Sequence, residues 1–193
     1  MFGERGIRLL AGLLVVFTLA AGVACGSNKS QEELAGEALQ RGLLAHKAGN
    51  VDEAVADYRE ALAHDPRNKY AFYNLGLIDQ TRGNLQGAET NYRNAMSADP
   101  NFTPALFNLA IVRTKVGAYE EAISLYRQVV SLAPDDAAAH LNLGFVLKQT
   151  GKVKAGNTEL SRAVKLDPQL AERIPSTSAS AANRPTPSQS PGN

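Results

Sequence analysis

Three asparagines recur every 34 residues, and they are the side chains of this 193-residue chain best suited to bind another polypeptide. Asn74, Asn108 and Asn142 each carry an amide, which offers two N–H donors and a carbonyl acceptor. A row of such amides can pair with the N–H and C=O groups of an extended peptide backbone. Alternatively, each asparagine only tethers a neighbouring helix or its backbone. The spacing is compatible with both roles.

Apolar residues with the same spacing lie within four positions of these asparagines. We expect them to form the rest of a peptide-binding site, and they are Tyr70, Tyr73, Phe107, Ile111, Leu141 and Phe145. Tyr73 and Phe107 are the preferred contacts because aromatic rings bury a large area at a small cost in side-chain entropy. The competing interpretation is that some of these side chains pack adjacent helices together, particularly Ile111 and Phe145.

The other reactive side chains do not support catalysis or metal binding. His46, His64 and His140 fall at different places in the 34-residue period, so they share neither a helix face nor a metal-ligand spacing. There is no nucleophile–base pair and no glycine-rich phosphate loop. The 20 basic residues are balanced by 19 acidic ones and form no basic stripe, which argues against nucleic acid as a partner. We expect a protein that is not an enzyme and uses no metal or cofactor.

The elements that must position the asparagines repeat with the same period. The register is set by Pro66, Pro100, Pro134 and Pro168, and by Gly49, Gly83, Gly117 and Gly151. Each unit (35–68, 69–102, 103–136 and 137–170) contains two apolar stripes of helical spacing, divided by the glycine and closed by the proline. Gly76 lets the two helices of its unit approach closely, and the ring of Tyr92 fills the remaining space. Thr103 and Pro104 are expected to be the N-cap and first helical residue of the third unit.

These positions closely resemble the signature of the tetratricopeptide repeat (TPR), over residues 35–170. The resemblance implies an all-α fold, an α-solenoid of four TPR helix-turn-helix units in a right-handed superhelical stack. It also implies that the first helices line a concave groove. The row formed by the asparagines resembles the asparagine ladder of O-linked N-acetylglucosamine transferases.

The two ends of the predicted TPR domain, residues 34–174, differ from its interior. Arg41 stands where the other units have leucine, as is common in a terminal repeat. At the other end, little chain remains to cap the last unit before Pro175. We expect either a short cap from Leu170 and Ile174 or self-association through this end.

Residues 1–24 have the pattern of a bacterial secretory signal, since Arg5 and Arg8 precede an uncharged apolar run. The only cysteine, Cys25, follows this run and resembles the lipidated cysteine of a bacterial lipobox, although Gly22 stands where leucine is usual. The resemblance implies a lipid on Cys25 and a linker over 25–33. The alternative is an uncleaved signal anchor. Both place the repeats outside the cytoplasm, because the arginines precede the apolar run.

Residues 175–193 are rich in Pro, Ser and Thr and show no apolar periodicity, which predicts a disordered tail. The predicted function is that of a membrane-anchored TPR scaffold, exported and facing the periplasm or the exterior from the cell membrane or outer membrane. It would bind extended or helical protein segments and help to assemble a cell-envelope complex. In this it resembles TPR lipoproteins of pilus assembly and envelope biogenesis. The alternative is a structural protein, anchored by an uncleaved N-terminal helix, that self-associates and binds no peptide.

Overall fold

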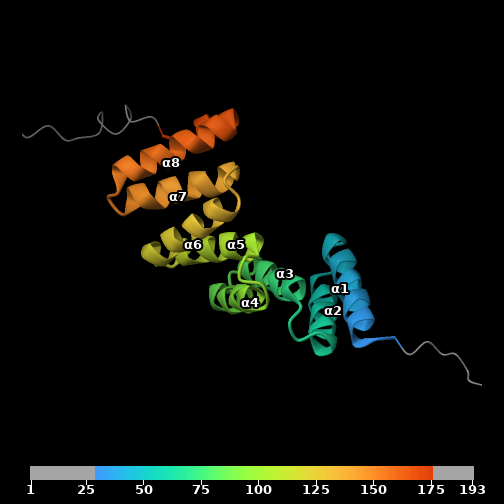
Figure 1. Ribbon diagram of the computed structural model, residues 1–193. Helices are drawn as coiled ribbons and strands as arrows, with labels where there is room; N and C mark the ends of the chain where they lie inside the picture. Colours follow the sequence, from blue (N-terminus) through green and yellow to red (C-terminus); the bar gives the residue numbers. More distant parts are fainter. Residues whose placement is uncertain (1–28, 176–193) are drawn as a thin grey trace, which may run out of the picture.

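The computed structural model describes residues 29–175, and these form a row of antiparallel helix pairs (Figure 1). The elements are α1 (Gln31–Lys47), α2 (Val51–His64), α3 (Lys69–Thr81), α4 (Leu85–Ala98), α5 (Thr103–Lys115), α6 (Tyr119–Leu132), α7 (Ala137–Gln149), α8 (Val153–Leu166) and the 3₁₀ helix η1 (Pro168–Arg173). Within this range no helix has the length and apolar character needed to cross a membrane. The predicted signal, Cys25 and the tail after Pro175 lie outside the described residues.

The predicted all-α solenoid of four TPR units is confirmed. The pairs α1–α2, α3–α4, α5–α6 and α7–α8 follow one another along a curved row, with the first and last pairs at opposite ends (Figure 1). Each second helix packs against the first helix of the next pair, and the first helices α3 and α5 also contact each other. Residues 34 apart in the sequence therefore occupy equivalent places in successive pairs.

The turn inside each pair depends on its glycine. Gly83, which lies between α3 and α4, has a φ of 79°. This left-handed conformation is strained for a residue with a Cβ atom. Gly49, Gly117 and Gly151 adopt the same conformation. The second helices end two residues before the predicted prolines: Asp99, which precedes Pro100, is extended with φ −144° and ψ 101°.

The interior of each pair is a close contact between a small residue and a large one. A Cβ atom added to Gly76 would lie 2.6 Å from Cε1 of Tyr92, whose ring is completely buried. A Cβ atom added to Gly42 would lie 2.7 Å from the Tyr58 ring, and one added to Gly144 would lie 2.7 Å from Leu160 Cγ. The predicted packing of the small eighth residue of each unit against the large twenty-fourth is confirmed at these contacts.

The first helix starts earlier than the sequence periodicity indicates. α1 begins at Gln31 instead of near residue 34, because Ser30 and Glu33 form a capping box. The Ser30 hydroxyl accepts a hydrogen bond from the Glu33 backbone N–H, and the Glu33 carboxylate accepts one from the Ser30 backbone N–H. The 34-residue repeat does not predict this capping box, because Ser30 and Glu33 precede the first unit.

The predicted N-cap of the third unit is wrong by one residue. Thr103 is the first residue of α5, and Phe102 is the N-cap, without a side-chain hydrogen bond. At the equivalent places Asn68 and Asp136 accept hydrogen bonds from the backbone N–H groups of the residues three positions later. Phe102 instead packs its ring against aromatic residues of α3.

The C-terminal end carries the predicted short cap. η1 follows α8, and Leu170 is only 9% exposed where it packs with Leu141, Leu160 and Ala163. Ile174 is partly buried against the same cluster. Only part of α8 is covered in this way.

Candidate functional site

The candidate site is a cavity of about 330 Å³ where α3, α5 and the segment before α7 meet. It is lined by Tyr73, Thr103, Pro104, Phe107, Asn108, Ala133 and Asp136. Three predicted site residues, Tyr73, Phe107 and Asn108, are therefore brought together in one cavity. Because Tyr73 comes from one unit and the other two from the next, the cavity exists only through the stacking of units.

The two aromatic rings are held from behind by the core. Tyr73 packs on Tyr92 with ring centroids 6.0 Å apart, and Phe107 packs edge-to-face on Tyr126 at 5.8 Å. Tyr92 and Tyr126 are buried, whereas Tyr73 and Phe107 are only partly so. The rings are consequently fixed in place and keep an accessible side, as a preorganised contact surface requires.

Asn108 and Tyr73 form the polar part of the cavity. Asn108 Nδ2 donates a hydrogen bond to Tyr73 Oη at 3.1 Å, which links α5 to α3. Burial raises the pKa of the Tyr73 phenol, and the hydrogen bond from Asn108 opposes this shift in part. The phenol therefore stays neutral near pH 7, so its O–H remains a donor while its oxygen accepts from Asn108.

The other two asparagines bond to their own helices. Asn74 Nδ2 donates to the Tyr70 carbonyl at 2.7 Å, and Asn142 Nδ2 donates to the Ala138 carbonyl at 2.9 Å. Asn74 is also only 9% exposed. One amide N–H of each asparagine is thus committed within the protein, as the tethering interpretation expects. The amide oxygens accept none of the hydrogen bonds found within residues 29–175, so the ligand-binding role stays a prediction.

An aromatic surface extends from the cavity toward α3. Tyr70 is 50% exposed, and its ring lies edge-to-face with Phe102 at 5.5 Å. Phe102 makes the same contact with Tyr73. Lys69 Nζ lies 5.2 Å from the Tyr70 centroid and 5.1 Å from that of Phe102. The sequence interpretation missed Phe102, although an aromatic residue where Asn68 and Asp136 stand was a signal for it.

The prediction that Leu141 contacts a ligand is wrong. Its side chain is completely buried against Leu160, Ala163 and Leu170, so it belongs to the core and offers no surface to a ligand. The cause is η1, because Leu170 joins the cluster that encloses Leu141. Ile111 and Phe145 are partly buried and pack against core clusters while keeping some exposure. Both remain predicted contacts at the edge of the site.

His140, a reactive side chain away from the cavity, has a structural role. His140 Nε2 lies 3.0 Å from the Pro134 carbonyl, and His140 Nδ1 lies 2.6 Å from Glu159 Oε2. The buried imidazole therefore ties α7 to α8 and to the preceding loop. Within the described part of the chain, no three His, Cys, Asp or Glu residues are placed to hold a metal ion together.

The family comparison agrees with the helix pairs. The model for the Cilia and flagella-associated protein 70 middle TPR-like domain matches residues 32–166. The chain belongs to this TPR-like family. Its TPR domain accounts for most of the sequence, and the fold is generally one of protein–protein interaction scaffolds. Among curated proteins, none matches the sequence significantly.

Solved structures with a similar fold include two of MamA and one of PilF. A crystal structure of MamA is 19% identical, with a TM-score of 0.65, covering 72% of this chain and 81% of that one. MamA from Desulfovibrio magneticus RS-1 is 24% identical, with a TM-score of 0.66 and coverages of 72% and 78%. PilF of Pseudomonas aeruginosa is 26% identical, with a TM-score of 0.63 and coverages of 72% and 64%. The MamA likeness concerns the fold of the TPR domain alone.

Proposed function

We propose that this protein is an exported, membrane-anchored scaffold whose TPR domain binds an extended or helical segment of a partner in a cell-envelope complex. The observation that carries the proposal is the cavity shared by Tyr73, Phe107 and Asn108. It combines two fixed aromatic rings with hydrogen-bonding groups, and it is of a size to take one apolar side chain of the partner. The adjoining Tyr70 and Phe102 rings would continue the contact along the segment.

We infer that apolar contacts contribute more to the binding affinity than hydrogen bonds do. Contact with the rings of Tyr73 and Phe107 would supply most of the affinity, because buried aromatic residues dominate protein interfaces. The free amide oxygen and second N–H of Asn108 would pair with the partner's backbone, each neutral hydrogen bond contributing about 1 kcal/mol. Asn142 would act in the same way further along the row.

The anchor part of the proposal depends on Cys25, which lies outside the described residues. It is supported by the apolar run that follows Arg5 and Arg8 and by the lipobox-like sequence at Cys25. Cys25→Ser should release the protein from the membrane into the soluble or secreted fraction. If this variant stays membrane-bound and unprocessed, the N-terminal segment is an uncleaved anchor instead.

Binding at the cavity is tested by photocrosslinking in cells. A photoreactive phenylalanine analogue at position 70 should crosslink to one partner, and the product should disappear when Phe107→Ala is introduced. The same probe at position 132, an exposed leucine at the end of α6, serves as the control. If the crosslinked product forms equally with the probe at position 132, the cavity is not the binding site. The same holds if the product still forms in folded chains that carry Phe107→Ala or Asn108→Ala.

A further inference from the structure

Inside the chain, the second helix of one unit packs on the first helix of the next unit three times. At each end of the array formed by residues 29–175, one helix lacks such a neighbour. α2 packs on α3, α4 on α5, and α6 on α7. α1 has no second helix before it among the described residues, and α8 is followed only by η1 in the same part of the chain. Both ends lie apart from the cavity between α3 and α5, so a role for them is independent of the proposed function.

Two apolar positions of these internal junctions have exposed apolar counterparts at the ends, whereas a third position, held by Leu75, Leu109 and Leu143, is occupied by Arg41 in α1. At the α2–α3 junction, Val51 and Ile78 line the same small cavity, and Ile78 is 3% exposed. Val112 and Val146, which are equivalent to Ile78, are also buried. Their counterpart in α1 is Leu44, which is 59% exposed.

The same difference appears on the second helices. Leu85 and Tyr119 are equivalent to Val51, and both are partly buried against the core. Tyr119 also contacts the following first helix, since its Oη accepts a hydrogen bond from Gln149 Nε2 at 2.7 Å. The counterpart in α8 is Val153, which is 50% exposed. Leu44 and Val153 are therefore the two side chains that a neighbouring helix would cover.

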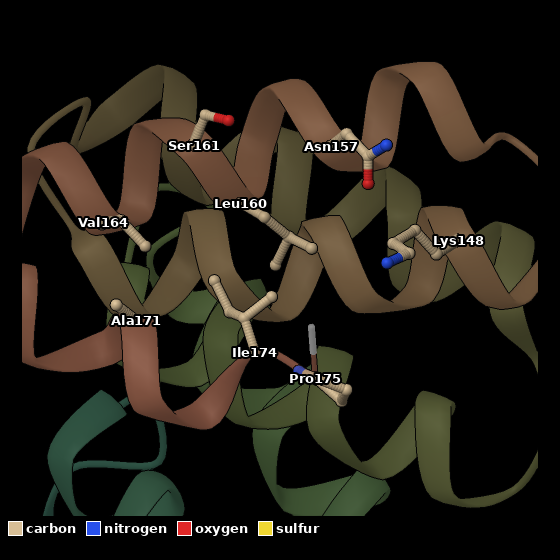
Figure 2. A pocket seen from close by; sticks show the side chains of 8 residues that line it. All are labelled: Lys148, Asn157, Leu160, Ser161, Val164, Ala171, Ile174 and Pro175. Atoms are coloured by element: carbon tan, nitrogen blue, oxygen red, sulfur yellow. The ribbon is translucent and has the colours of Figure 1, made fainter. Parts of the chain in front are cut away.

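η1 leaves a defined part of α8 open. In the 34-residue register, Ile174 is equivalent to Leu106 of α5, so η1 occupies the place where a fifth first helix would begin. Pro175 follows immediately and prevents the helix from continuing. Beside it is a cavity of about 550 Å³, whose lining includes Leu160 and Val164 of α8, Ala171 of η1, and Ile174 and Pro175, which follow η1 (Figure 2). Figure 2 shows these side chains directed into the space between the two elements.

The charges of the two ends are complementary. Residues 29–68 contain eight Asp and Glu against five Lys and Arg, whereas residues 137–175 contain three against six. Arg41 is included in this count; it pairs within its own unit with Asp57 at 3.0 Å and with Glu60 at 2.5 Å, one positive charge against two negative ones, so the acidic excess of this end remains. On α8, Lys154 and Lys165 take part in none of the ion pairs among the described residues. Such complementarity favours contact between unlike ends over contact between like ends.

We propose that the protein self-associates head to tail, with the α1 end of one copy seated on the open part of α8 of the next. Leu44 of one copy would meet Val153 of the other, as Ile78 meets Val51 inside the chain. The chain's own tail is a poorer occupant, because residues 176–193 contain alanine as their only apolar residue type besides proline. A head-to-tail contact uses two different surfaces and so continues from copy to copy in a row.

The test is disulfide crosslinking between copies of the full chain, with Cys25→Ser as the background. Leu44→Cys and Val153→Cys are purified separately, mixed and mildly oxidised. We expect a crosslinked pair in the mixture, and a ladder of larger products when one chain carries both cysteines. Val116→Cys is the matched control, since Val116 is also 50% exposed but lies between α5 and α6.

Two outcomes would overturn the proposal. Crosslinks of Val153→Cys only with itself would mean that like ends pair. A yield in the mixture no higher than that of Val116→Cys would mean that no second copy covers this end, as when the tail occupies it. An independent measurement uses sedimentation equilibrium without cysteines: Val153→Lys should weaken self-association about tenfold, and Val116→Lys should not. Both residues are exposed, so folding should be preserved.

Discussion

The third and fourth units both place an apolar residue and an asparagine at the same two positions, yet their surfaces differ. In α5, Phe107 lines a cavity and Asn108 reaches across to Tyr73, whereas in α7, Leu141 is buried and Asn142 bonds to its own helix. The residue at the matching place in the preceding unit explains the asparagines. Asn108 follows a unit with Tyr73, which has a hydroxyl, while Asn142 follows Phe107, which has none. Equivalent positions have the same backbone conformation, but the hydrogen bonds of their side chains depend on the residues of the neighbouring unit.

The largest effect should come from the interior contact that the units share. Gly76→Leu would force an isobutyl group into the Tyr92 ring and should lower the free energy of unfolding by about 3 kcal/mol or more. Gly36→Leu is the control, because a Cβ atom there meets no atom within 4 Å. Thermal and denaturant unfolding measure both. Equal stability of the two variants would contradict the close packing of the hairpins.

Leu141→Ala tests the fourth unit. Removing this completely buried side chain should cost about 3 kcal/mol. Because units in a solenoid depend mainly on their neighbours, hydrogen exchange should accelerate in α7, α8 and η1 while α1 and α2 stay protected. If exchange is unchanged in α7 and partner crosslinking is lost instead, Leu141 would be a ligand contact after all.

Phe107→Ala tests the third unit at its surface. We expect partner affinity to fall about tenfold, the effect of losing one aromatic anchor. Leu39→Ala is the matched control, because Leu39 occupies the equivalent place in α1 but does not line the cavity. Binding of the identified partner segment to both variants can be followed by fluorescence anisotropy. Equal losses would show that the cavity has no special role.

The smallest effect should come from Tyr73→Phe, which removes the hydroxyl that accepts from Asn108. Asn108 can then bond to the carbonyl four residues earlier, as Asn74 and Asn142 do, so the cost should be about 1 kcal/mol. NMR of the Asn108 side-chain amide should report the change. The reverse variant, Phe107→Tyr, should draw Asn142 away from the Ala138 carbonyl. Unchanged amide signals in both variants would contradict our account of the two units.

The sequence predicts most of this fold because its period reports local geometry. The glycine turns, the helix ends before proline and the Gly76–Tyr92 contact each depend on residues within one unit, and all are confirmed. The failures at the candidate site arise where another segment intervenes. Leu141 is buried because η1 adds Leu170 to its cluster. Phe102 joins the aromatic surface through contacts with Tyr70 and Tyr73 of the preceding first helix. No single unit contains the information needed to predict either.

The capping box at Ser30 limits how far the domain can stand from a membrane. If Cys25 carries the lipid, only five residue steps separate the anchor from Ser30, the N-cap of α1. Fully extended, they span roughly 18 Å. The first unit would therefore stay beside the lipid headgroups, with no freedom to search the space beyond them. A row of copies tethered in this way would have to run along the bilayer rather than away from it.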